Sequence, residues 1–138
     1  MKYLDGSEII EALQKTYRVY LCGNLEKPQK ELKWIHDEQL EIGISHYQDF
    51  TADSPHLHTD ATEYNYVIKG SSKVLILAEE REYVFASGSL FVIPQNTKYA
   101  SKHSADTQIL FIKSPGGNDK QLIDVSPKLQ TWLQSWNG

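Results

Sequence analysis

The chain has 138 residues, 40% of them hydrophobic and 23% charged, with a formal net charge of −4 at pH 7. These values are typical of one globular domain, so we predict a single domain over residues 1–138. The acidic balance argues against nucleic acid or an anionic membrane as a partner, because both attract a basic surface. The one cysteine excludes an intramolecular disulfide, and no stretch resembles a signal peptide or a membrane span, so we expect a cytoplasmic protein.

Helical periodicity is confined to the two ends of the chain. Near the N-terminus one apolar stripe is formed by Ile9, Ile10, Leu13 and Tyr17. Asp5 or Ser7 is suited to cap its start. The corresponding stripe near the C-terminus is formed by Leu129, Trp132, Leu133 and Trp136, with Pro127 suited to the first turn. We therefore predict a short helix at each end.

Short β-like runs occupy most of the chain between these helices. The runs cover residues 17–22, 32–36, 40–47, 64–68, 73–77, 82–85, 89–93 and 108–113. Clusters of Gly, Pro, Asn, Asp and Ser separate them, which is typical of turns between strands. Residues 74–77 and 109–112 are apolar at every position, which indicates strands covered on both faces. The pattern predicts an all-β sandwich or barrel.

A cluster of potential metal ligands follows the third of these runs. His56 and His58 are two residues apart, so on a strand their side chains point to one face with Cα atoms ~7 Å apart. Glu63 follows a predicted turn and is placed to add an oxygen from the next strand. Two imidazoles and one carboxylate suit Fe, Mn, Ni or Zn as divalent ions. We predict His56, His58 and Glu63 as ligands of a divalent transition metal, although two surface histidines beside an acid would give the same local pattern.

The spacing beyond these histidines resembles the first motif of the cupin superfamily. Four residues separate His58 from Glu63, and six more separate Glu63 from Gly70, while Phe50 stands where an upstream glycine is usual. This resemblance implies a cupin double-stranded β-helix, a jelly-roll barrel. It also implies a barrel core over about residues 30–115, with the terminal segments packing outside.

A second cupin-like motif follows at the expected distance. Gly88 and Pro94 are separated by five residues, and Asn96 replaces the usual glycine of the turn. Asparagine tolerates left-handed backbone angles, so this change is mild. The two motifs together cover about residues 50–103, and the tail over residues 113–120 is similar to a closing segment of some single-domain bacterial cupins.

Tyr99 stands where the second cupin motif usually supplies a histidine ligand. A phenol, with a pKa near 10, is a poor ligand for a divalent ion at neutral pH. Three interpretations follow. The metal is held by the three other residues alone, or Tyr99 binds as phenolate, or no metal is bound and the polar pocket serves metal-free binding or acid–base chemistry. Tyr99 is the candidate catalytic acid or base in the first and third interpretations.

Two further histidines are candidates for the pocket. His46 alternates with Leu40, Ile42 and Ile44, so it shares the apolar face of its run, either inside the barrel or as a packed rim histidine. His103 lies four residues after Tyr99, so a continuous strand would place both on one face, whereas a polar hairpin would leave His103 in solvent. We predict His46, Tyr99 and His103 as residues of the substrate pocket.

Fold alone does not define the activity, because cupins host very different chemistries. The resemblance implies a small cupin with a divalent metal in the barrel that binds or acts on a small polar molecule, with sugars among the candidates. An enzyme of this kind would be a metal-dependent oxygenase, isomerase or lyase. The alternatives are a metal-free carbohydrate-binding cupin and a sugar-nucleotide epimerase or isomerase. An enzyme that acts on sugar nucleotides needs contacts to the phosphates, and the small number of arginines, only two, argues against it. Cupins commonly pair through their sheets, so we also predict a homodimer.

Overall fold

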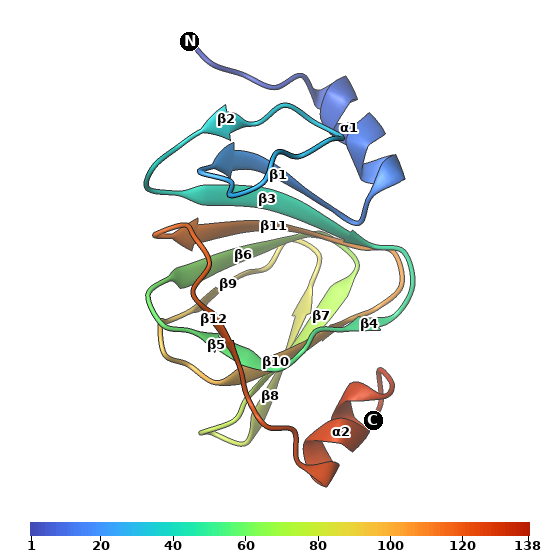
Figure 1. Cartoon of the computed structure of the whole chain (residues 1–138). Coiled ribbons are helices and arrows are strands. Elements are labelled where there is room, and N and C mark those ends of the chain that lie inside the picture. The colour runs from blue at the N-terminus through green and yellow to red at the C-terminus, as the bar shows by residue number, and fades with distance from the viewer.

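The chain folds into two β-sheets with one short helix at each end (Figure 1). The computed structural model describes residues 1–138. In chain order the elements are α1 (Gly6–Lys15), β1 (Arg18–Gly23), β2 (Ile35–His36), β3 (Glu41–Tyr47), β4 (Thr51–Ala52), β5 (His56–His58), β6 (Thr62–Lys69), β7 (Ser71–Ile76), β8 (Arg81–Ala86), β9 (Leu90–Ile93), β10 (Tyr99–His103), β11 (Thr107–Ser114), β12 (Lys120–Leu122) and α2 (Pro127–Leu133). The predicted all-β class with two terminal helices is confirmed. Neither helix is long and apolar enough to cross a membrane.

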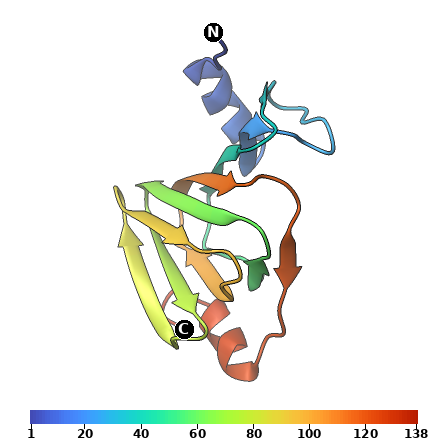
Figure 2. The ribbon, with the colours of Figure 1, turned by 90° about the vertical axis from the view of Figure 1, so that its left-hand side faces the viewer.

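The two sheets each contain six strands and enclose the interior of a barrel (Figure 2). In the first sheet the strand order is β2-β1-β3-β11-β6-β9. In the second sheet it is β12-β5-β10-β7-β8, and β4 also pairs with β10. Only β1 and β2 pair in parallel, and every other pair is antiparallel. From β6 onward the chain passes repeatedly between the sheets, so residues distant in sequence meet inside the barrel.

Helix α1 covers the outer face of the first sheet near β1 (Figure 1). Asp5 caps it, since its side chain accepts the backbone N–H of Ser7 at 3.1 Å. Ala12 and Leu13 are buried against Val19 and Leu32. The predicted apolar stripe is therefore only partly correct. Ile9 and Leu13 face the sheet, whereas the side chains of Ile10 and Tyr17 are exposed.

Strand β3 turns its apolar side outward and its more polar side inward. Ile44 packs against the cluster beneath α1, whereas Ser45 and Tyr47 are buried on the opposite face and line the interior. Both faces of β3 are covered, so apolar character alone did not identify the inner one. His46 shares the face of Ile44 and consequently lies outside the barrel cavity.

Helix α2 covers the outer face of the second sheet. Ser126 caps its start by accepting the backbone N–H of Leu129 at 3.1 Å. At its C-terminal end Lys102 of β10 donates to the carbonyl groups of Trp132 and Ser135, both at 2.7 Å. These contacts satisfy carbonyl groups that a helix end leaves without partners. Every residue of β10 is buried, because the barrel interior covers one face and α2 covers the other.

Turns with left-handed backbone angles position the metal-ligand candidates. Asn96 has φ 60°, as its place in the second motif predicts, and its N–H donates to the His58 carbonyl at 2.7 Å. Gly70 has φ 82°, and a Cβ there would lie 2.2 Å from Thr107 Oγ1. Only glycine combines that angle with so close an approach of β11. Both motif turns therefore hold the strands that carry the site.

Candidate functional site

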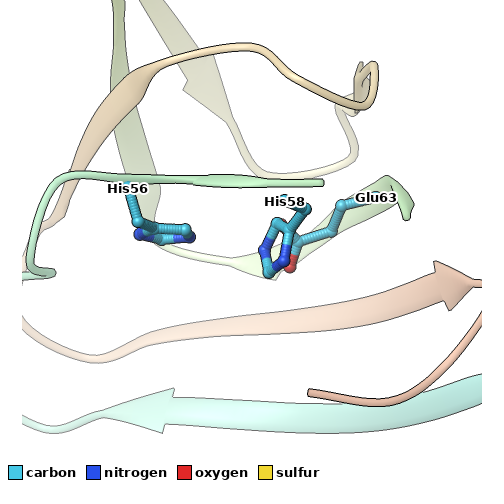
Figure 3. A group of neighbouring side chains, drawn as sticks. All are labelled: His56, His58 and Glu63. Atoms are coloured by element: carbon cyan, nitrogen blue, oxygen red, sulfur yellow. The ribbon is translucent and has the colours of Figure 1, made fainter. Parts of the chain in front are cut away.

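His56, His58 and Glu63 converge inside the barrel (Figure 3). The two histidines extend from the same side of β5, and Glu63 reaches them from the start of β6. One nitrogen or oxygen atom from each residue lies within 4.8 Å of the others, and His58 Nε2 lies 3.5 Å from Glu63 Oε2. Donors bound to one ion at ~2.1 Å are separated by at most about 4.2 Å, so the group needs only slight closure to hold a metal.

Hydrogen bonds at the outer nitrogens fix the orientation of both histidines. His56 Nδ1 lies 2.7 Å from the carbonyl oxygen of Ser54, and His58 Nδ1 lies 2.9 Å from Asp119 Oδ1. Both partners only accept, so each Nδ1 carries the proton and donates it. In the neutral form each Nε2 therefore presents a lone pair to the interior. This tautomer is the one that metal-binding histidines require.

Asp119 holds His58 and is itself held by several donors. Its Oδ2 accepts the backbone N–H groups of Asp60 and Ala61 at 3.0 and 2.8 Å. Lys113 Nζ lies 3.1 Å from its Oδ1. Burial alone would raise the pKa of Asp119, but the two N–H groups, His58 and Lys113 lower it well below the ordinary value. Asp119 is therefore an ionised partner of His58 at neutral pH.

The electrostatic surroundings separate the pKa values of the two histidines. Burial lowers the pKa of His56 below its usual value. Burial also acts to lower the pKa of His58, but hydrogen bonds to Glu63 and Asp119 outweigh it and raise that pKa. Burial opposes ionisation of Glu63, yet His58 and Tyr99 keep its pKa below the ordinary range. The group thus combines a neutral imidazole, a more basic imidazole and a carboxylate.

Tyr99 contributes the only hydroxyl group that touches this cluster. It pairs with His56 across β10 and β5, and its oxygen lies 2.8 Å from both His56 Nε2 and Glu63 Oε2. Burial and the nearby Glu63 raise the pKa of Tyr99 well above its usual value, so it stays a phenol at neutral pH in the metal-free protein. One phenol proton faces two acceptors, and His58 Nε2 presents a third. The cluster is rich in lone pairs, which is the chemistry of a cation site.

These residues border a cavity of about 530 Å³ that is lined by residues of both sheets. Tyr99 and His103, two of the predicted pocket residues, line it. His46 does not, because the outward face of β3 directs it to Asp106, where its Nε2 lies 3.0 Å from Oδ1. A cavity of this size is typical of sites for small molecules.

A second polar cluster occupies the same cavity around Asp53. Asp53 Oδ2 lies 2.9 Å from His103 Nε2 and accepts from the hydroxyl groups of Ser101 at 3.2 Å and Tyr47 at 3.4 Å. The rings of Tyr47 and His103 stack with centroids 4.1 Å apart, and His103 Nδ1 lies 2.8 Å from Ser72 Oγ. Asp53 is therefore a half-buried carboxylate held through Oδ2, and its Oδ1 is left to accept hydrogen bonds.

Asp53 should make stability depend on acidic pH. Burial opposes its ionisation, but His103, Arg18 and Ser101 lower its pKa below the ordinary 3.8. A carboxyl group with a depressed folded-state pKa stabilises the fold above its unfolded pKa and loses that effect as pH falls through the folded value. We expect Asp53→Asn to be less stable than the wild type at pH 7, with the difference shrinking below pH 3.8. Urea unfolding at several pH values measures this, with exposed Asp49→Asn as control, and a pH-independent difference contradicts it.

The sequence alone did not identify several residues that line the cavity or support the site. Arg18, Tyr47 and Asp53 line it, and Asp119 orients His58 from outside the donor set. Asp119 lies in the tail that resembles a closing segment of some small cupins, and this resemblance was the one feature of the sequence that could have pointed to it. Arg18 and Asp53 belong to no recognisable motif, because only the pairing of strands within the sheets brings them to the cavity.

Comparison with known proteins supports the fold. No curated protein matches the sequence. Among solved structures, KdgF from Halomonas sp. is 19% identical with a TM-score of 0.57, covering 74% of this chain and 80% of that protein. A protein from Bacillus halodurans is 12% identical with a TM-score of 0.63, and the match covers 86% of this chain and 84% of that protein. Streptomyces Pac13, described as a nucleoside dehydratase, is 12% identical with a TM-score of 0.55, covering 63% of this chain and 70% of that protein.

At these identities the solved structures show a shared fold only. The family model named cupin matches residues 47–135, which include both motifs, the His56–His58–Glu63 cluster and α2. The two-sheet barrel is the double-stranded β-helix that the motifs predict. The chain therefore belongs to the cupin family.

Proposed function

We propose that the chain is a metal-binding cupin whose cavity takes a small polar molecule, with His56, His58 and Glu63 as the metal donors. The observation that carries this proposal is the orientation of the two histidines. Both Nδ1 atoms are tied to acceptors, so both Nε2 lone pairs face Glu63 inside the barrel. Fe, Mn, Ni and Zn as divalent ions all suit two imidazoles and a carboxylate.

The protein groups around the cavity suit proton transfer and orientation. A bound divalent ion would act as a Lewis acid on an oxygen of the bound molecule. The Tyr99 hydroxyl can donate a proton to the bound molecule. It can also pass a proton from that molecule on to His56 or Glu63, which are its hydrogen-bond partners. Asp53, Ser101 and Tyr47 offer hydrogen bonds to hydroxyl groups of the same molecule. In an enzyme, this arrangement favours isomerase, lyase or oxygenase chemistry on a sugar-like compound.

Metal content of the untagged protein, measured by mass spectrometry, tests the proposal. We expect about one divalent ion per chain in the wild type and loss of that ion in His58→Ala, because the variant removes one of three donors. His46→Ala is the matched control, since His46 lies outside the cavity and pairs with Asp106. A metal-free wild type after supplementation with each candidate ion, or equal metal loss in both variants, refutes the metal centre.

A second candidate function is metal-free acid–base chemistry or metal-free carbohydrate binding. The contact of 2.8 Å between Tyr99 O and His56 Nε2 favours it, because a phenol acid beside an imidazole base needs no ion. Pac13, described as a nucleoside dehydratase, shares the fold and gives a precedent for small-molecule chemistry in such a barrel. A metal-free wild type that binds or converts a sugar would support this function over the first.

The homodimer stays a prediction. Exposed apolar side chains gather on the outward faces of two paired strands, β6 and β9, in a set formed by Tyr64, Tyr66, Ile68, Leu90 and Val92. Such a face is consistent with a subunit interface.

A further inference from the structure

Arg18, on β1, brings a guanidinium group into the lining of the cavity. Its polar partners are neutral. Nε donates to Ser45 Oγ at 2.9 Å, and Nη2 donates to the Tyr47 hydroxyl at 3.5 Å. The guanidinium carbon also lies 5.4 Å from the centre of the Phe111 ring. Arg18 is therefore held in place without a negatively charged partner in contact.

Among the cations that line the cavity, Arg18 is the partly buried one without an ion pair, because Lys27 and Lys120 are exposed. Ion pairs with lysine involve only Lys15, Lys69 and Lys113, and no arginine forms one. Lys113 also lines the cavity, but Asp119 and Glu41 lie 3.1 and 3.7 Å from its Nζ. Asp53 is connected to Arg18 only through the Tyr47 hydroxyl. A partly buried cation without an anion in direct contact is rare, because its lost hydration is only partly compensated.

The guanidinium has unused hydrogen-bonding capacity. It carries five N–H donors, and the contacts to Ser45 and Tyr47 occupy two of them. The remaining donors form a planar fork, which matches the two oxygens of a carboxylate. A bound carboxylate would supply an anion in direct contact and acceptors for the donors that Arg18 leaves free.

Arg18 is linked to the metal-ligand cluster through the polar residues of the cavity. Tyr47 accepts from Arg18 and donates to Asp53, which in turn accepts from Ser101. Ser101 lies two residues from Tyr99 on the same face of β10, a separation of ~7 Å. One small molecule can therefore span the distance from the Asp53 cluster to Tyr99 and still reach Arg18.

We propose that Arg18 is the anchor for a carboxylate group of the molecule that this cavity binds. The proposal rests on the function proposed above, that the cavity takes a small polar molecule, and narrows it to small hydroxy acids. A carboxylate fits better than a phosphate, because its two oxygens match the planar fork and because Asp53, which Tyr47 links to Arg18, would repel a second negative charge more strongly. The hydroxyl groups of such an acid would meet Asp53 and Ser101, and its far end would meet Tyr99.

Acids paired with neutral compounds of the same carbon skeleton test this assignment. The probes are gluconate with sorbitol and glucuronate with glucose, and glucose 6-phosphate tests for phosphate. In calorimetric titrations of the wild type, we expect at least one acid to bind about tenfold more tightly than its neutral partner, the factor typical of charge-assisted hydrogen bonds. The proposal is overturned when neither acid binds better than its partner, or when the sugar phosphate binds best.

Matched arginine variants assign the effect to one residue. Arg18→Met removes the guanidinium and keeps an unbranched apolar stem, and we expect it to lose the preference for the acid. Arg81→Met is the control, because Arg81 is exposed on β8 and contacts the Tyr83 ring. Retention of the preference in Arg18→Met, or equal loss in Arg81→Met, overturns the assignment. If Arg18→Met does not fold, Arg18→Lys keeps the charge without the fork and should weaken the preference.

Metal content separates failure of this proposal from failure of the metal centre. Arg18 is not a metal donor, so Arg18→Met should retain as much metal as the wild type. A metal-free wild type that still prefers acids refutes the metal centre and leaves the carboxylate site standing. A metal-loaded protein without any acid preference refutes the carboxylate site alone.

Discussion

Replacing Asp119 with asparagine is expected to lower the metal affinity about 10- to 100-fold, which is the usual cost of losing the hydrogen-bond partner of a metal-binding histidine. This effect is expected although Asp119 itself contributes no metal donor. Its carboxylate accepts the Nδ1 proton of His58 at 2.9 Å, which fixes the ring and increases the basicity of Nε2. The neutral amide keeps the size of the side chain but not its charge. Competition with a chromogenic chelator, using Zn²⁺ or Co²⁺, measures the change.

The matched control for this variant is Asp124→Asn. Asp124 is exposed and belongs to the same C-terminal segment, so it carries the same chemical change without contact to His58. We expect its affinity to equal that of the wild type. Equal affinities in Asp119→Asn and Asp124→Asn would mean that His58 needs no carboxylate partner to bind the ion.

Replacing Lys113 with methionine is expected to destabilise the fold by about 3–5 kcal/mol, the usual cost of leaving a buried charge unpaired. Lys113 Nζ lies 3.1 Å from Asp119 and 3.7 Å from Glu41, and it donates to the Gly117 carbonyl at 2.6 Å. The side chains of Asp119 and Glu41 are only 10% and 13% exposed. Methionine preserves the packing of the stem, leaves Glu41 without a cation and leaves Asp119 with only His58 and two backbone N–H groups. Urea unfolding at pH 7 measures the difference.

Lys69→Met gives the reference for an ion pair at the surface. Lys69 pairs with Asp106 at 3.0 Å, but the two side chains are 46% and 66% exposed. Exposed pairs of this kind contribute about 1 kcal/mol or less, so this variant should remain close to the wild type. If Lys113→Met is no less stable than Lys69→Met, the cluster of Lys113 with Asp119 and Glu41 does not stabilise the barrel.

The part of the site that is local in sequence could be predicted. His56 and His58 share a face because strand residues alternate, and Glu63 follows after one turn, so spacing alone brought the three together. The second motif likewise placed Tyr99 against this cluster, where its hydroxyl contacts His56 and Glu63. Asn96 was expected to accept a left-handed conformation, and its φ of 60° confirms this.

The remainder depends on pairings that sequence spacing does not encode. Asp119 meets His58 across 61 residues, and Asp53 meets His103 across 50. His46 was predicted in the pocket but does not line the cavity, because both faces of β3 are covered and His46 lies on the face that packs under α1. Arg18 was noted in the sequence only as one of two arginines, and β1 places it in the cavity.

The pairing of β12 with β5 also means that the parts of the site come together in a fixed order during synthesis. β12 aligns Lys120 with His58 and Leu122 with His56, and Asp119 precedes it directly. During synthesis the N-terminal part of a chain emerges and begins to fold first, so His56, His58 and Glu63 leave the ribosome well before Asp119. His58 cannot take its fixed orientation until that later segment has emerged and docked. For the metal centre proposed above, a nascent chain would therefore hold an ion poorly, and the completed barrel would acquire the ion from the pool in its surroundings.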